Sequence, residues 1–189
     1  MHFEHLFKWL CYGWFAAEAI LAIATRTRRS GGTLHDRGTQ LLLWVTITVA
    51  MVGSDWVQKI APWSMFHDAE WLMPLSLAVL VTGLTIRSIA IISLGKAFSV
   101  NVAIRSAQKV RRTSLYRFVR HPSYLGMEVG FFAIGLSTRN WACLVWVFVL
   151  PTLAILYRIH VEEAALNEAF GEEYADYSRV TKRLFPGVY

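Results

Sequence analysis

Five apolar segments alternate with polar stretches along this chain. They cover residues 6–25, 41–57, 71–94, 124–137 and 141–160. A helix needs roughly 20 apolar residues to cross a bilayer, and about 17 at the least. The first, third and fifth segments meet this length, the second is marginal, and the fourth meets it only if its helix runs from Pro122 to Asn140. Because the runs are continuous and do not alternate, they disfavour a β-barrel and predict an all-α, polytopic membrane protein with about five transmembrane helices.

The last two apolar segments are joined by the short polar link Thr138-Arg139-Asn140. A link this short places two helices side by side and antiparallel, so we expect a helical hairpin. After it, apolar residues recur at helical spacing and predict an amphipathic C-terminal helix over about 161–180, which Gly171 could divide into two pieces: Leu166, Phe170, Tyr174 and Tyr177. We therefore divide the chain into N-terminal transmembrane helices (1–94) and a C-terminal region that carries the chemistry (95–189).

Composition and charge agree with a membrane protein. Hydrophobic residues make up 55% of the chain and charged residues only 17%, against about 25% charged in soluble domains. Most of the 19 Lys and Arg lie in the loops after the first and third segments and in the tail, and five crossings put these three regions on one side. The positive-inside rule then places the N-terminus outside and the C-terminus in the cytosol. This distribution explains the net charge of +6 and disfavours a nucleic-acid partner.

Some residues inside the apolar segments are candidates for special roles. Glu18, Arg87 and Glu128 are ionisable, which is costly in a bilayer. Glu18 could pair with Arg87 or with a loop arginine, and Arg87 could instead extend its charge to the interface. Gly126 and Gly130 form a GxxxG pattern, which is typical of close helix packing.

The strongest cluster lies at the cytosolic ends of the predicted hairpin. His121 and Tyr124 precede the fourth segment, and Arg158 and Glu162 share one helix face at i, i+4 where the fifth segment ends. The hairpin would bring these groups together in a pocket at the membrane surface. A belt of interfacial salt bridges is the alternative. We expect no metal, because His160 and the glutamates after it lack a metal-binding spacing.

Several motifs in this half of the chain resemble the isoprenylcysteine carboxyl methyltransferase family, and related phospholipid methyltransferases share much of the pattern. The resemblance covers roughly residues 95–189, while the first 90 residues match only as hydrophobic segments. Its motifs occur in the family's order and spacing: Arg120-His121-Pro122-Ser123-Tyr124-x-Gly126, Arg158-x-x-x-Glu162-Glu163, Phe170-Gly171-Glu172-Glu173-Tyr174-x-x-Tyr177, and Arg183-Leu184-Phe185-Pro186.

The resemblance implies an integral membrane methyltransferase that uses S-adenosyl-L-methionine and admits a lipophilic or prenylated substrate from the bilayer. Glu162 would meet the cofactor's amino group and His121 its carboxylate, while Arg158 would hold the substrate head group. We expect Arg158 and Glu162 to be catalytic. The cofactor-binding residues implied by position are Gln108, Lys109, Val110, Arg111, Tyr116, His121, Pro122, Ser123, Tyr124 and Glu162.

Two positions depart from the family pattern. Gln108 stands where the family often has His, and Ser114 stands where it often has Gly, a residue that can supply a positive φ. The short N-terminal part is similar to that of smaller prokaryotic members, so a bacterial or archaeal inner membrane is favoured. We expect O-methylation of an isoprenylcysteine-like carboxylate. The alternatives are a phospholipid amine or small-thiol methyltransferase, a sterol-type membrane reductase (disfavoured by Ser123, where that group usually has Asn), and a non-enzymatic membrane module.

Overall fold

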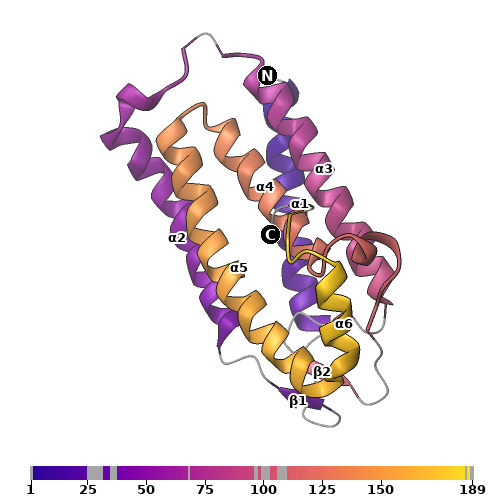
Figure 1. The fold of residues 1–189 in the computed structure, drawn as a ribbon. Helices are drawn as coiled ribbons and strands as arrows, with labels where there is room; N and C mark the ends of the chain where they lie inside the picture. Colours follow the sequence, from indigo (N-terminus) through magenta and orange to yellow (C-terminus); the bar gives the residue numbers. More distant parts are fainter. Residues whose placement is uncertain are drawn as a thin grey trace.

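Helices dominate the protein in the computed structural model, which describes residues 2–24, 32–34, 38–67, 69–95, 98, 103–105, 110–185 and 187. Figure 1 shows the order of the elements along the chain. The elements are α1 (His2–Ala24), β1 (Gly32–Leu34), α2 (Thr39–Ile60), the 3-10 turn η1 (Pro62–Ser64), α3 (Leu72–Leu94), β2 (Ala103–Arg105), the 3-10 turn η3 (Ser114–Arg117), α4 (Pro122–Ser137), α5 (Trp141–Phe170) and α6 (Glu172–Val180).

Four helices in the described part of the chain are long and apolar enough to cross a membrane: α1, α2, α3 and α5. They support a polytopic membrane protein. The predicted fourth segment forms α4, which has 16 residues. At 1.5 Å per residue it is about 24 Å long, shorter than a hydrocarbon core of about 30 Å. Crossing by α4, and with it the count of five spans, stays a prediction.

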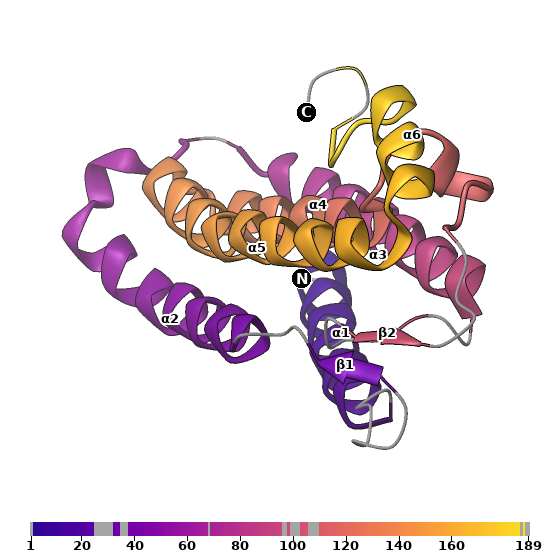
Figure 2. The ribbon, with the colours of Figure 1, turned by 60° about the horizontal axis from the view of Figure 1, so that its bottom comes forward.

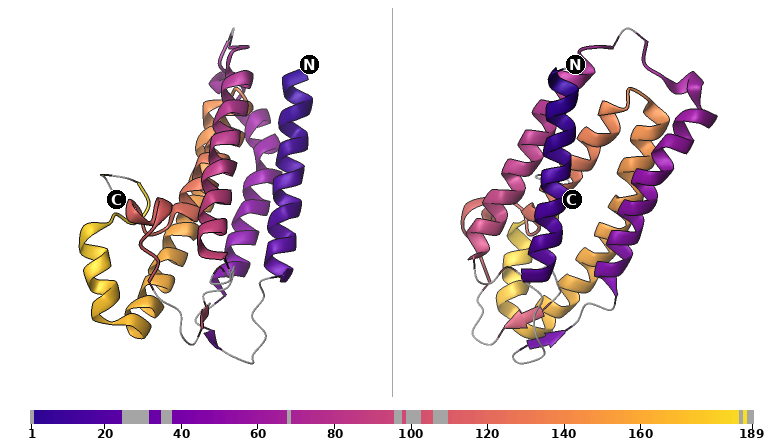
Figure 3. Two further views of the ribbon diagram at one scale, coloured as in Figure 1. Left: turned by 90° about the vertical axis from the view of Figure 1, so that its right-hand side faces the viewer. Right: turned by 180° about the vertical axis from the view of Figure 1, so that it is seen from behind.

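The helices form three layers (Figures 1–3). Helices α3, α4 and α5 make the central row, in which α4 packs against both neighbours. Helices α1 and α2 cover one side, where α1 contacts α3 and α2 contacts α5, and α6 lies on the other side. Outside these layers, β1 and β2 pair antiparallel, with Thr33 opposite Ile104.

The predicted hairpin is present. Helices α4 and α5 pack side by side and antiparallel. Arg139 takes a φ of 53° in the turn, and the Asn140 side chain caps α5 by accepting from the Cys143 N–H at 2.9 Å. The same Asn140 donates to the Ala61 carbonyl at 3.0 Å, which ties the turn to the α2–α3 connection. Pro122 occupies the first turn of α4, as the sequence predicts.

The GxxxG pattern brings α4 close to its neighbours. A Cβ on Gly126 would lie 2.6 Å from the backbone nitrogen of Arg87 and 2.7 Å from the carbonyl oxygen of Gly83. A Cβ on Gly130 would lie 2.5 Å from the ring of Trp14. Glycine is therefore required at both positions for α1 and α3 to approach α4, and the packing interpretation of this motif is confirmed.

The tail forms two helical pieces separated by Gly171. This glycine has a φ of +51°, which ends α5 and starts α6 in a new direction. The stripe of the amphipathic helix is buried at Tyr174 and Tyr177, each 3% exposed. Beyond α6, the tail pairs in parallel with the residues that lead into α4, through a bridge between Val119 and Lys182.

Candidate active site

A chain of polar contacts joins α4 to α5 where the two helices meet the tail. The Tyr124 hydroxyl donates to Glu162 Oε2 at 2.9 Å and accepts from Arg158 Nε at 2.8 Å. Arg158 is 2% exposed, although it carries a full charge. Its Nη1 also donates to Thr39 Oγ1 at 2.7 Å, at the first turn of α2. Three of the four residues of the predicted cluster, Arg158, Tyr124 and Glu162 (the Arg158 trio), are thus in direct contact.

His121 lies between two carboxylates. Its Nδ1 is 3.8 Å from Glu162 Oε2, and its Nε2 is 3.4 Å from Glu163 Oε1. The ring stacks on that of Tyr124, with centroids 5.6 Å apart. The imidazole is buried, and the His121 backbone N–H is held by the Arg183 carbonyl at 3.0 Å.

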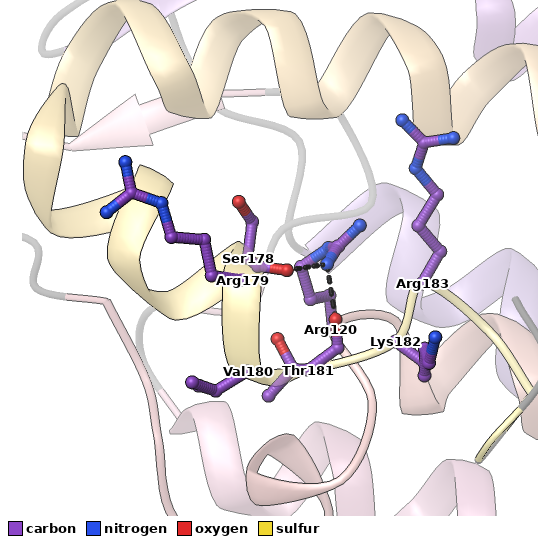
Figure 4. A pocket seen from close by; sticks show the side chains of 7 residues that line it. All are labelled: Arg120, Ser178, Arg179, Val180, Thr181, Lys182 and Arg183. Carbon is purple, nitrogen blue, oxygen red and sulfur yellow. Dashed lines mark hydrogen bonds between the residues drawn. The ribbon is translucent and has the colours of Figure 1, made fainter.

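Glu163 is the centre of an ion cluster. It accepts from Arg120 Nε at 2.7 Å through Oε1 and from Arg183 Nε at 2.8 Å through Oε2. Arg120 also donates to the carbonyls of Ser178 and Thr181, as Figure 4 shows. This cluster fastens α5, α6 and the tail to the residues just before α4. These salt bridges lie next to the candidate site.

The intramembrane pair of Glu18 and Arg87 also reaches the site. Arg87 Nε and Nη2 contact both carboxylate oxygens of Glu18, and both residues are buried. Arg87 Nη1 donates to Ser123 Oγ at 2.6 Å. The pairing with Glu18 is confirmed. The pair links α1 and α3 to the first turn of α4.

The remaining predicted residues lie around this centre. Tyr116 is buried, and its hydroxyl donates to the Ala90 carbonyl of α3 at 3.5 Å. Burial raises the pKa of Tyr177 to about 12, so its phenol stays protonated and donates to the Tyr116 carbonyl at 2.6 Å. Val110 is half-buried and Arg111 is exposed. Gln108 and Lys109 lie outside the described residues.

Two further residues that the sequence analysis singled out are Ser114, at a position where the family often has glycine, and Glu128, an ionisable residue in an apolar segment. Ser114 has a φ of +58°, a conformation that glycine would adopt without strain. Glu128 is 1% exposed and accepts from Thr152 Oγ1 at 2.7 Å. Its other oxygen, Oε1, has no hydrogen-bond partner among the described residues.

Sequence reasoning did not single out Glu163, Arg120 and Arg183 as a unit. Glu163 lies next to Glu162 on α5, but its partners come from segments 43 and 20 residues away. The sequence offered one signal for this cluster: Glu162 and Glu163 are adjacent carboxylates in a chain with a net charge of +6, so arginine partners could be expected for them. Only the return of the tail to residues 118–121 brings the guanidinium groups to it.

The arrangement suits a particular kind of chemistry. It offers a buried guanidinium, a carboxylate whose side chain is 30% exposed, and stacked His and Tyr rings, all within a few ångströms. A guanidinium can hold an anionic acceptor, and a carboxylate can hold a cationic group beside it.

Comparison with known proteins supports this interpretation. The model of the isoprenylcysteine carboxyl methyltransferase (ICMT) family matches residues 76–168. Protein-S-isoprenylcysteine O-methyltransferase B of Arabidopsis thaliana is 27% identical over 86% of this chain and 82% of its own. Methanethiol S-methyltransferase 1 of Bradyrhizobium diazoefficiens is 39% identical, over 38% of this chain and 24% of its own.

A solved structure shares the fold. The eukaryotic intramembrane Ras methyltransferase ICMT superposes with a TM-score of 0.64 at 23% sequence identity, over 77% of this chain. This chain spans 52% of that one. The matched family region contains α4, Arg158, Glu162 and Glu163, the residues that build the site described above. The family model and the curated relatives together support the isoprenylcysteine carboxyl methyltransferase family for this chain.

Proposed function

We propose that this membrane methyltransferase moves a methyl group from S-adenosyl-L-methionine to the carboxylate of a lipophilic, isoprenylcysteine-like acceptor. The observation that carries this proposal is Arg158, a buried guanidinium held by Tyr124 and Thr39 beside Glu162. Among the relatives, those named protein-S-isoprenylcysteine O-methyltransferases match over the greatest length of this chain. We assign the chemistry to residues 95–189 and the role of membrane scaffold to residues 1–94.

The residues present fit the cofactor. Glu162 is the partly exposed carboxylate of the site and would hold the cofactor's ammonium group. Tyr116, Pro122, Ser123 and Tyr124 would border it, together with the stretch 108–111. When bound, the cofactor supplies a methyl group on a positively charged sulfur.

His121 receives a different assignment from the one expected. Both of its ring nitrogens face carboxylates, Glu162 on one side and Glu163 on the other. A third carboxylate, that of the cofactor, would have to displace one of these contacts. We therefore assign His121 to orient Glu162 and to stack on Tyr124, as a positioning residue.

Arg158 would position the acceptor. A carboxylate nucleophile is already ionised at neutral pH and needs no general base. It needs a cation that fixes its oxygens in line with the methyl group, and a planar guanidinium does this through paired hydrogen bonds. The Tyr124 hydroxyl fixes the guanidinium from Nε.

A small thiol is a second candidate acceptor. The relatives named methanethiol S-methyltransferase have the higher identities, 39% and 36%, although over shorter stretches of this chain. A thiol must lose its proton to react, and Glu162, the partly exposed carboxylate of the site, would serve as the base. For either acceptor, we propose that the site faces the cytosol, with the N-terminus outside, in a bacterial or archaeal inner membrane.

The test combines cofactor binding with an acceptor screen. Calorimetry with S-adenosylhomocysteine is expected to show binding by wild type and by Arg158→Ala, and weaker binding by Glu162→Ala. Glu172→Gln, an exposed carboxylate on α6, is the matched control. Radiolabelled methyl transfer to prenylcysteine, lipid amine and thiol acceptors is expected to favour prenylcysteine and to fall roughly 100-fold or more in Arg158→Ala. Equal loss of binding and transfer in Arg158→Ala would refute its assigned role.

A further inference from the structure

A basic groove lies along α6 and the tail, beside the ion cluster of Glu163. Its volume is about 330 Å³, and it is lined by α6 and the tail together with Arg120: Arg120, Ser178, Arg179, Val180, Thr181, Lys182 and Arg183. Figure 4 shows the three guanidinium groups spread along it. The lining has four basic side chains and no acidic one.

Ion pairs neutralise only part of this charge. Arg120 and Arg183 both pair with the carboxylate of Glu163. Arg179 pairs with Asp176 at 2.8 Å, but both side chains are more than 60% exposed, so the pair is weak. Lys182 is exposed and has no ion pair among the described residues. The dipole of α6 accounts for a cation at Arg179, in its last turn, but not for Lys182 and Arg183, which lie beyond the helix.

The backbone pairing of the tail indicates where the groove lies relative to the membrane. The Arg120 N–H donates to the Lys182 carbonyl at 2.8 Å, and the His121 N–H donates to the Arg183 carbonyl at 3.0 Å. These residues come directly before Pro122, where the apolar helix α4 begins. Lys182 and Arg183 therefore lie level with the start of an apolar helix of the bundle, where lipid headgroups are expected.

Exposed apolar side chains accompany the basic ones. Val180 is 79% exposed, Phe118 is 51% exposed and Phe185 is 38% exposed. Phe118 precedes α4, and Val180 and Phe185 flank the basic residues of the tail. Cations beside exposed aromatic and aliphatic groups are typical of surfaces that rest on a bilayer.

We propose that this groove binds the phosphate headgroup of an anionic membrane lipid and so holds α6 and the tail against the bilayer. Arg179 and Lys182 would contact the phosphate, while Val180 and Phe185 would contact the upper acyl chains. This inference does not depend on the methyl-transfer proposal. It adds a lipid that is neither substrate nor cofactor.

The test uses the full chain in nanodiscs of phosphatidylcholine with or without phosphatidylglycerol. Native mass spectrometry measures the phosphatidylglycerol that stays bound, and hydrogen exchange measures protection of residues 172–185. The variant Arg179→Gln/Lys182→Gln removes two charges that make no contact with the candidate active site. The matched control is Lys8→Gln/Lys59→Gln, which removes two exposed charges at the opposite end of the bundle.

Wild type and control are expected to retain phosphatidylglycerol and to gain protection over 172–185. The double variant is expected to bind it about 25-fold more weakly, at about fivefold per charge. Equal retention in the double variant, or no protection of 172–185, would overturn the proposal. Equal protection by soluble glycerol phosphate in phosphatidylcholine nanodiscs would also overturn it, because the ligand would then be a free phosphate ester.

Discussion

Arg87 and Glu18 allow a quantitative test of how the outer helices support the site. Both are buried, and each supplies the other's compensating charge inside the helix bundle. Glu18 also accepts from Trp14 Nε1 at 2.9 Å, and Arg87 also donates to Ser123 Oγ at 2.6 Å. Removing one member leaves the other as a buried charge with only neutral partners among the residues that the structure describes.

The expected cost follows from that imbalance. Leaving one partner of a buried ion pair uncompensated destabilises a protein by about 3–5 kcal/mol. For a chain of this size, each kcal/mol shifts the melting temperature by about 2–4 °C. Glu18→Gln and Arg87→Met should therefore each lower the melting temperature by roughly 6–20 °C. The double variant leaves no charge uncompensated, so it should be less destabilised than the sum of the two single variants by about 1–3 kcal/mol.

Thermal unfolding in detergent micelles measures these differences, and calorimetry with S-adenosylhomocysteine reports whether loss of the Arg87–Ser123 contact weakens the site. The control is the half-exposed pair of Arg139 and Glu4, whose closest charged atoms are 3.7 Å apart. Glu4→Gln should change stability by less than about 1 kcal/mol. Additive losses in the Glu18/Arg87 double variant would refute the conclusion that the two charges compensate each other.

Three further substitutions test separate features. Gly126→Ala should destabilise the bundle by about 1–3 kcal/mol in thermal unfolding, because the added Cβ meets backbone atoms of α3 at 2.6–2.7 Å; Gly13→Ala, which meets nothing within 4 Å, is the control, and equal effects would contradict the packing. Ser114→Gly should raise the melting temperature by about 1–4 °C, because it relieves a φ of +58°; a decrease would argue against strain there. Tyr124→Phe should lower kcat/KM about tenfold to a hundredfold, because the hydroxyl between Arg158 and Glu162 is lost while the ring stack on His121 remains. It should also lower the melting temperature by about 2–12 °C, because the buried Arg158 Nε loses that partner; unchanged kcat/KM would exclude a role for that hydroxyl.

The positions of the helices could be predicted because a segment that crosses a bilayer must be both apolar and helical. A backbone in hydrocarbon must satisfy its hydrogen bonds within the helix, so apolar segments mark helices directly. The length of α4 was harder to predict. The apolar pattern permits a helix through Asn140, but Thr138 ends α4 and Asn140 caps α5 by accepting from the Cys143 N–H. Cap geometry of this kind depends on which backbone groups are left unpaired, and hydropathy carries no information about that.

The contacts of the site were predictable to the extent that they are local. Arg158 and Glu162 share a face because they are four residues apart, and the short turn at residues 138–140 brings Tyr124 to them. The full cluster around Glu163 was not predictable, because Arg183 arrives through the reversal at Gly171 and the pairing of residue 182 with residue 119. The direction of a chain after a glycine with positive φ is set by tertiary contacts, which a single sequence does not display.

The residues just before α4 and in its first turn form a short continuous motif that contacts several other helices. Within the helix, successive residues point about 100° apart, so Ser123 and Tyr124 face different partners. Arg120 and His121 reach Glu163 on α5, while Ser123 accepts from Arg87 on α3. Tyr124 then turns back to α5, where it joins Arg158 to Glu162. A displacement of this segment would therefore disturb the candidate acceptor and cofactor contacts together, so substitutions at the α3–α4 contact should alter methyl transfer even though they touch neither ligand.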